Sequence, residues 1–394
     1  MKSISKKIGL LSLIAFAAGI AAGLLIPEFC ISIEVLGTVY VNLLKIMIVP
    51  VIFTEITSAL ARDTENISRI TITTIIVFIT MFIVSFIICS LLWTAIRPGT
   101  GVIFDEIAWE GDLDELSFGA FLLSMFPSNI LTAMSSNALL PTIIFAFVFG
   151  IAIRQCKLSK LRDVIAELDT AFGKMLSYVM YLTPIGAFAL ISNTVAQYGS
   201  KILGTAAVYI GCGYLGCVVI MILVMILPVW IFCKISPAEY IKKAYKVWVL
   251  TLTTCSSAAT LPTTIKVCNE DFGVPEKITK IVVPLGCTIH MCGGAVSFSL
   301  LAMFNIQMMG LTVTPGFMLL MVLFALLLNM AAPGLPGGGI VVGATYLSLL
   351  GIPLTFIGFY AGIYRILDMA YTTMNVCGDI TANVLISKIN EKTV

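Results

Sequence analysis

The sequence has few charged residues and only one histidine, and these shortages exclude several classes of protein. Charged residues make up 11% of the 394 positions, whereas soluble domains carry roughly 25%. No phosphate-binding loop, dinucleotide fingerprint or basic stripe is present, so we expect no cofactor and no nucleic-acid partner. A chain with so few charges and with long apolar runs is typical of a protein that lies in a lipid bilayer.

Apolar sequence is what the chain has in quantity. Hydrophobic residues make up 59% of it, and its mean hydropathy is +1.06. The first apolar segment, near 8–26, is long enough to span a bilayer of roughly 30 Å at about 1.5 Å per residue. We interpret it as a retained membrane helix rather than a cleaved signal peptide. The eleven cysteines are scattered through apolar stretches, so we expect buried, reduced thiols rather than disulfides.

The distribution of charge predicts the orientation in the membrane. Lysine and arginine gather near the N-terminus, around 154–162, around 242–246 and near the C-terminus, whereas the gap at 97–116 holds six acidic residues. Basic loops stay in the cytoplasm. We therefore expect a multi-pass protein of the cell (inner) membrane with both termini cytoplasmic, which requires an even number of crossings.

Three stretches do not have the pattern of simple membrane crossings. TLTTCSSAATLPTT (251–264) is rich in serine and threonine, TIHMCGG (288–294) interrupts a long apolar segment, and AAPGLPGGGIVVG (331–343) holds prolines and glycines. Non-helical backbone at membrane depth is tolerated only where protein buries it or a cavity hydrates it. Such breaks form the substrate and ion sites of secondary transporters.

The last apolar segment carries a polar stripe. Arg365, Asp368, Thr372, Asn375 and Asp379 follow one another at helical spacing, so they lie on one face of the predicted helix. Ionisable groups within a membrane helix face a bundle interior or a cavity, and they indicate function. A self-neutralising pair of Arg365 and Asp368 would explain only the start of the stripe.

Several of these stretches resemble the glutamate transporter homologues, a family of dicarboxylate/amino acid:cation symporters. The resemblance covers essentially the whole chain. It rests on SSAATLPTT, PLGCTIHMCGGA, PGLPGGG and LDMAYTTMNVCGD, and on NLLKIMIVPVIFTEI and YLTPIGAFALIS earlier in the chain. It implies an all-α polytopic membrane protein with eight transmembrane helices, two re-entrant helical hairpins and inverted repeats. Such a protein is an elevator-type homotrimer that binds a small-molecule amino acid within the lipid bilayer, and it is not an enzyme.

The resemblance also implies a division of the chain into a static scaffold and a mobile transport domain. The expected parts are scaffold helices 1 and 2 (1–69), transport-domain helix 3 (70–98), an extracellular acidic loop (99–118), scaffold helices 4 and 5 (119–200) and the transport-domain core (201–394). The core would hold helix 6, the first hairpin, broken helix 7, the second hairpin and helix 8.

Substrate-binding positions carry over from the family residue by residue. Asp368 matches the aspartate that holds the substrate ammonium, and Asn375 matches the asparagine that binds the α-carboxylate. The remaining expected substrate residues are Thr372, Tyr371, Ser256, Ser257, Gly294 and Gly337. An aspartate beside an asparagine suits an amino acid better than a plain dicarboxylate, because the aspartate would repel a second carboxylate.

Two departures from the family favour a neutral substrate. Members that carry acidic substrates place an arginine where this chain has Tyr371, and a threonine near the substrate side chain is replaced by Gly294. The planar cation that would bind a side-chain carboxylate is therefore missing from this position. The sodium-coupled acidic amino acid or dicarboxylate symporter remains the alternative.

The coupling-ion positions depart further. Cys292 stands in place of a sodium-binding aspartate, and His290 in place of an asparagine. Other sodium positions hold Phe78, Met81, Phe82, Asn329 and Ala332, whereas Asp379, Asn375 and Thr288 keep oxygen ligands. We therefore expect reduced or absent sodium coupling.

His290 is expected to lie near Asp379 and to supply the positive charge that sodium supplies elsewhere. A histidine gains and loses charge near neutral pH, which indicates possible proton coupling through His290 and Asp379. A purely structural histidine is the competing interpretation.

A metal site of Cys287, His290, Cys292 and Cys377 matches no familiar zinc spacing. An anion channel, or an intramembrane enzyme that uses Cys255 or Ser257 with His290, completes the alternatives.

Overall fold

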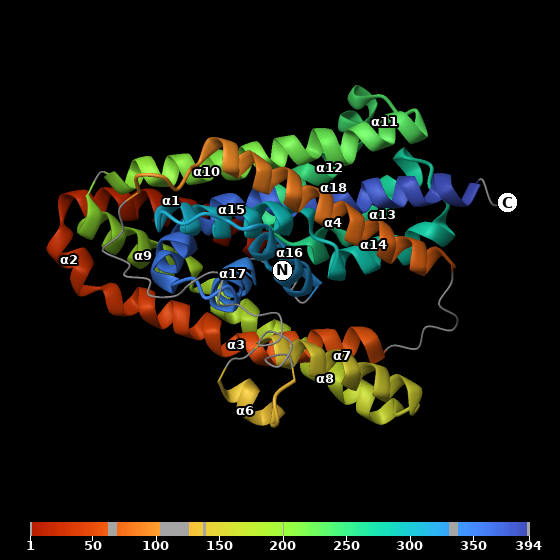
Figure 1. Cartoon of the computed structure of the whole chain (residues 1–394), viewed down its shortest axis with the longest axis horizontal. Helices are drawn as coiled ribbons and strands as arrows, with labels where there is room; N and C mark the ends of the chain where they lie inside the picture. The colour runs from red at the N-terminus through yellow and green to blue at the C-terminus, as the bar shows by residue number, and fades with distance from the viewer. Residues whose placement is uncertain are drawn as a thin grey trace.

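The computed structural model describes residues 2–61, 69–102, 126–136, 139–199, 201–330 and 338–391, and its regular elements there are all helices (Figure 1). The helices of the first half are α1 (Lys2–Leu25), α2 (Pro27–Ser32), α3 (Glu34–Ala61), α4 (Arg69–Ile96), α6 (Ile130–Ser135), α7 (Leu139–Gln155), α8 (Ser159–Tyr181) and α9 (Thr183–Tyr198). The second half holds α10 (Lys201–Ile220), α11 (Leu227–Cys233), α12 (Pro237–Thr254), α13 (Ser257–Lys266), α14 (Glu276–Ile289), α15 (Cys292–Met308), α16 (Pro315–Met330), α17 (Gly338–Leu349) and α18 (Ile357–Glu391).

The first group of helices packs around α9 and α3. Helix α1 lies along α9, and α3 packs on α7, α8 and α9 (Figure 1). Small residues allow the close approach of α1 and α9. A Cβ atom on Gly19 would lie 2.4 Å from Cγ2 of Ile191, and one on Gly23 would lie 2.6 Å from the carbonyl oxygen of Ser192. Two glycines at i and i+4 therefore bring the two backbones together.

The second group is built around α18, which packs on α10, α12, α14, α15 and α17. Helix α4 joins this group, since it packs mainly on α15. In α18 the side chains from Tyr371 to Val384 are all buried. A helix that is buried on every side can carry polar groups only if its neighbours supply their partners. Helix α18 also packs on α9 of the first group, and the division of the chain into a static scaffold and a mobile transport domain stays a prediction.

The predicted helix breaks occur at two of the three places. Helix α12 ends at Thr254, Cys255 takes a left-handed conformation with a φ of 48°, and Ser256 caps α13 by accepting from the N–H of Ala259. Helix α14 ends at Ile289, and His290 is extended. The third break, 331–337, lies outside the described residues.

Some of the described helices are long and apolar enough to cross a membrane. Within the described residues, the spans that are long and apolar enough are Ile70–Ile96, Leu203–Cys233 and Glu276–Met308; a pair bent by 50°, Ser159–Val179 with Thr183–Gln197, forms a fourth if counted as one span. Other apolar helices, such as Pro315–Met330, are shorter. The count of eight crossings therefore stays a prediction.

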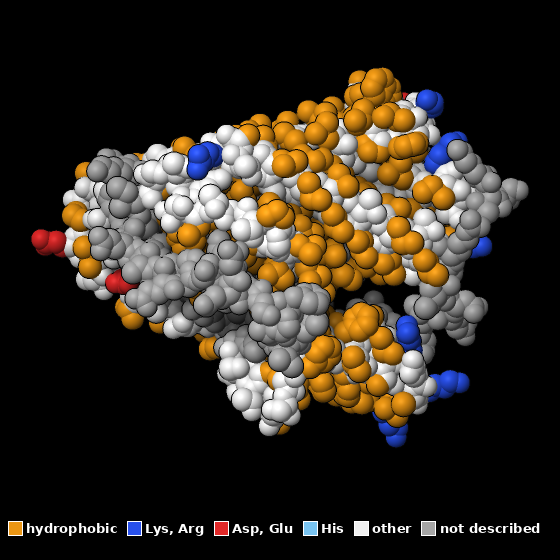
Figure 2. All heavy atoms as spheres, viewed as in Figure 1, with side chains coloured by type: hydrophobic (Ala, Val, Ile, Leu, Met, Phe, Trp, Pro, Cys, Tyr) orange, Lys and Arg blue, Asp and Glu red, His pale blue; other side chains and the backbone are white. Residues whose placement is uncertain are grey.

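The surface has the polarity of a membrane protein. Figure 2 shows hydrophobic side chains over the middle of one face, while Lys and Arg gather mostly toward the end near the C-terminus. Exposed apolar side chains include Leu91, Val218, Ile222, Trp230 and Phe232. All eleven cysteines are free and nine of them are buried, in line with their positions in apolar stretches of the sequence.

Replacing Gly23 with valine should destabilise the protein, because the added atoms would overlap the backbone of α9. Overpacking of this kind costs about 1–3 kcal/mol. Gly204→Val is the matched control, since a Cβ on Gly204 meets no atom within 4 Å. Thermal unfolding in detergent should show a lower midpoint for Gly23→Val than for Gly204→Val, and equal midpoints would contradict the packing.

Candidate functional site

A cavity with an empty volume of about 530 Å³ lies where the breaks meet α18. Its lining includes six of the predicted substrate residues, Asp368, Asn375, Thr372, Tyr371, Ser257 and Gly294. Other lining residues are Cys255, Met291, Gly293, Ser297, Phe298, Asn329, Gly339, Val342 and Tyr364. The chain thus brings residues from 255 to 375 to one place.

Asp368 is the carboxylate of the cavity, and neighbouring hydroxyls hold it. The Thr372 hydroxyl donates to Oδ1 of Asp368 at 3.2 Å, and the Tyr364 hydroxyl donates to the same oxygen at 3.4 Å. Tyr364 and Thr372 lie four residues before and after Asp368, so one helix face supplies both bonds. Asp368 is 6% exposed, and a carboxylate this buried is suited to binding a cationic group that enters the cavity.

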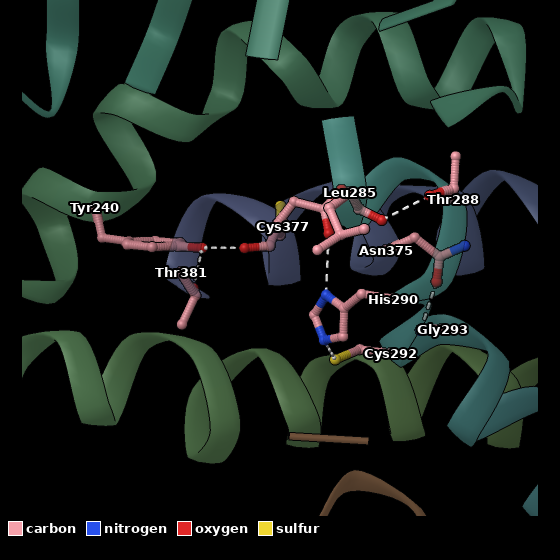
Figure 3. Close-up of polar contacts among 10 residues, drawn as sticks. Tyr240, Leu285, Thr288, His290, Cys292, Gly293, Asn375, Cys377 and Thr381 are labelled. Carbon is pink, nitrogen blue, oxygen red and sulfur yellow. Dashed lines mark hydrogen bonds and ion pairs between the residues drawn. The ribbon is translucent and has the colours of Figure 1, made fainter. Parts of the chain in front are cut away.

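Asn375 ties α18 to the start of α15. Its Oδ1 accepts from the backbone N–H of Gly293 at 2.8 Å (Figure 3). A Cβ on Gly293 would lie 2.1 Å from the carbonyl oxygen of Tyr371, so only glycine permits this approach. The Asn375 side-chain N–H groups remain on a residue that lines the cavity, where they can donate to a carboxylate.

Asn329 holds the other side of the break. Its amide pairs with the backbone of Met291, donating to the carbonyl at 3.0 Å and accepting from the N–H at 3.2 Å. Met291 separates α14 from α15, and its carbonyl also accepts from the N–H of Gly294 at 2.9 Å, so the Asn329 amide binds the residue that caps α15. Tyr364 and this role of Asn329 were not predicted. Asn329 is the one amide in an apolar helix, and Tyr364 lies one turn before Asp368, so both signals were present in the sequence.

His290 and Asp379 form a buried pair beside the cavity. Nδ1 of His290 lies 2.9 Å from Oδ1 of Asp379, and both side chains are at most 2% exposed. Nε2 lies 3.1 Å from Sγ of Cys292, and Figure 3 shows this contact at the break. The Phe78 ring of α4 stacks on the imidazole with a centroid distance of 4.3 Å. Both ring nitrogens therefore have partners. The placement of His290 near Asp379 is confirmed.

Two other predicted residues, Thr288 and Ser256, are not among the described residues that line the cavity. The Thr288 hydroxyl donates to the Leu285 carbonyl of its own helix (Figure 3), and Ser256 uses its hydroxyl as the α13 cap. Gly337 lies outside the described residues. Arg365 is buried but is not among the described residues that line the cavity. No group of three or more His, Cys, Asp or Glu side chains within the described part of the chain is placed to hold a metal ion.

Broken helices that meet at a cavity inside an apolar bundle are typical of secondary transporters. The model of the sodium:dicarboxylate symporter family matches residues 9–389, so the chain belongs to this family, as the motifs predicted. It is a transporter and not an enzyme.

Similar proteins fall into two groups by their substrates. The chain is 28% identical to a proton/glutamate-aspartate symporter of Bacillus subtilis (strain 168), covering 95% of this chain and 93% of that protein. It is 30% identical to a proton/glutamate-aspartate symporter of Escherichia coli (strain K12), with coverages of 90% and 85%. It is 27% identical to a C4-dicarboxylate transport protein of Deinococcus radiodurans, with coverages of 95% and 87%.

Replacing Gly286 with alanine should disrupt the pair, because the new Cβ would lie 2.3 Å from Oδ1 of Asp379 and 3.0 Å from the Phe78 ring. We expect a loss of stability of about 1–3 kcal/mol together with a loss of transport. Gly316→Ala is the control, because a Cβ at Gly316 has open space. Unfolding midpoints and uptake would both be measured, and a Gly286→Ala protein as active and as stable as the control would refute the arrangement.

Proposed function

We propose that this symporter carries a neutral amino acid, without a requirement for sodium and with a proton linked to its transport cycle. The main support for this proposal is that Asp368 and Asn375 line one cavity, and that its described lining has neither lysine nor arginine. The undescribed tip at 331–337 has no charged residue in its sequence either. An amino acid can place its ammonium on Asp368 and its carboxylate on the Asn375 amide, and no second charge remains to be matched.

A second candidate is an acidic amino acid or C4-dicarboxylate. The names of the relatives favour it, since they are glutamate-aspartate symporters and C4-dicarboxylate transport proteins. Arg365 would be the nearest cation along α18, three residues before Asp368. A substrate with two carboxylates would need that guanidinium to reach the cavity, because Tyr371 offers only a neutral hydroxyl at the cavity wall.

Proton linkage is supported by the environment of Asp379. The His290 imidazole contacts Asp379, and the Cys292 thiol and the Phe78 ring contact that imidazole, whereas hard cations bind oxygen ligands. The titratable groups near the pair are the thiols of Cys268, Cys292 and Cys377, each of which interacts electrostatically with Asp379. A proton shared between Nδ1 and the carboxylate can take the place of the bound cation. Two of the relatives are named proton symporters.

The assembly and orientation complete the proposal. We place the homotrimer in the cell membrane with both termini in the cytoplasm, and the second group of helices moves as the elevator. Lys and Arg side chains lie mostly toward one end of the molecule in Figure 2, which supports this orientation.

The first experiment is counterflow uptake into proteoliposomes of labelled L-alanine, L-serine, L-threonine, L-glutamine, L-aspartate, L-glutamate and succinate. We expect saturable uptake of neutral amino acids without sodium. Asp368→Asn should lower amino acid uptake by about 10- to 100-fold, because it removes a charge-assisted bond of about 1.5–3 kcal/mol to the ammonium.

Asp271→Asn serves as the control for loss of a carboxylate, since Asp271 pairs with Lys246 at 2.7 Å outside the cavity. Uptake of succinate alone, unchanged or increased by Asp368→Asn, would reject an amino acid substrate and favour the second candidate. Uptake that strictly requires sodium would reject the proposed coupling.

Removing the imidazole should abolish the pH response of uptake. His290→Asn should give a flat profile between about pH 5 and 8, whereas the native protein should show a pH-dependent rate. Tyr240→Phe is the control. It removes buried hydrogen bonds to the Thr381 hydroxyl (2.9 Å) and the Cys377 carbonyl (3.1 Å) on α18, the helix that carries Asp379, and leaves His290 unchanged. Should His290→Asn keep the native pH profile, the histidine is structural.

A further inference from the structure

The Tyr371 hydroxyl lies against α10, behind the wall of the cavity. Tyr371 lines the cavity and is 2% exposed, yet none of the described lining residues comes from α10. A Cβ atom on Gly213 of α10 would lie 2.9 Å from the Tyr371 hydroxyl oxygen and 3.6 Å from Cζ. The hydroxyl therefore occupies space that exists only because residue 213 has no side chain.

The contact between α10 and α18 is held in place next to this gap. The Tyr214 hydroxyl donates to the Ile366 carbonyl of α18 at 2.9 Å. One turn further on, a Cβ on Gly216 would lie 2.6 Å from Cγ1 of Val296. Because α10 is held at Tyr214 and packed closely at Gly216, it cannot move away from α18 at Gly213 without losing these contacts. A larger residue at 213 would instead displace the side chains of Leu367 and Tyr371.

The Tyr371 hydroxyl is buried and has no hydrogen-bond partner within the described structure. A buried hydroxyl without a partner costs about 1–3 kcal/mol, and such groups are usually satisfied by water or a ligand. On the cavity side, the Tyr364 ring is 6.5 Å from that of Tyr371, and the Tyr364 hydroxyl lies on Asp368. A hydroxyl moved away from α10 would therefore come nearer to the space that the substrate side chain occupies.

We infer that Gly213 determines substrate specificity by holding the Tyr371 hydroxyl in the wall against α10, which leaves room in the cavity for the substrate side chain. This inference rests on the proposed function, because it assigns the Tyr371 side of the cavity to the substrate side chain. Gly213 touches no substrate itself, so it is a positioning residue. A larger residue here should select for smaller substrates.

The experiment compares Gly213→Ala, Tyr371→Phe, the double variant, and Gly211→Ala as the matched control. Gly211 is on the same helix, and a Cβ there meets no atom within 4 Å. In Gly213→Ala, the KM for L-glutamine should rise about tenfold relative to that for L-alanine, as expected for an overpacked contact. The double variant should restore the native ratio, because removing the hydroxyl leaves Cζ at an ordinary contact distance.

Rescue separates a role in specificity from one in folding. Leu367 also lies near the new methyl group, at 2.6 Å, and this contact is the same in Gly213→Ala and in the double variant. If Gly213→Ala lowers the uptake of L-glutamine and L-alanine equally, and the double variant does not restore it, Gly213 acts through packing alone. That result would overturn the inference. A Gly213→Ala protein that behaves like Gly211→Ala would also overturn it.

A failure of the proposed function would give a different result from a failure of this inference. If the native protein takes up succinate and no amino acid, the neutral substrate is rejected. The same four variants are then compared for uptake of succinate and of the longer glutarate. The inference still requires that Gly213→Ala lowers glutarate uptake more than succinate uptake, and that the double variant restores the native ratio.

Discussion

The hydrogen bond between His290 and Asp379 is the interaction on which the polar interior of this bundle depends. A carboxylate inside an apolar bundle is costly unless a partner neutralises or hydrogen-bonds it. His290 supplies that partner at 2.9 Å, and it can do so only because the helix breaks between Ile289 and Cys292. Glycines at 286 and 378 leave the space in which the two side chains meet. The break between α14 and α15 therefore makes room for the His290–Asp379 pair as well as for the cavity.

The same break joins the pair to the substrate cavity. Gly293, three residues after His290, donates to Asn375, and Asn375 lies one turn before Asp379 on α18. A change in the charge of the pair acts on backbone and side chains that also line the cavity. This short connection gives a physical route by which a proton and a substrate can affect each other's binding.

Much of this site could be predicted from the sequence, because it depends on local rules. Helical spacing placed Asp368, Thr372 and Asn375 on one face, and glycine with polar residues marked the breaks. What could not be predicted depends on packing between distant segments. The stacking of Phe78 on His290 joins residues 212 positions apart, from 78 to 290, and the direction of the Tyr371 hydroxyl depends on a glycine in α10. Neither contact leaves a periodic signal.

Because the chain has one histidine, solid-state ¹⁵N NMR of histidine-labelled protein in lipid reports on His290 alone. The account predicts that the imidazole signals change protonation state with pH over the range in which uptake varies, and that Asp379→Asn alters this change. An imidazole that keeps one tautomer and one charge throughout that range, with or without substrate, would contradict a proton-carrying role for the pair.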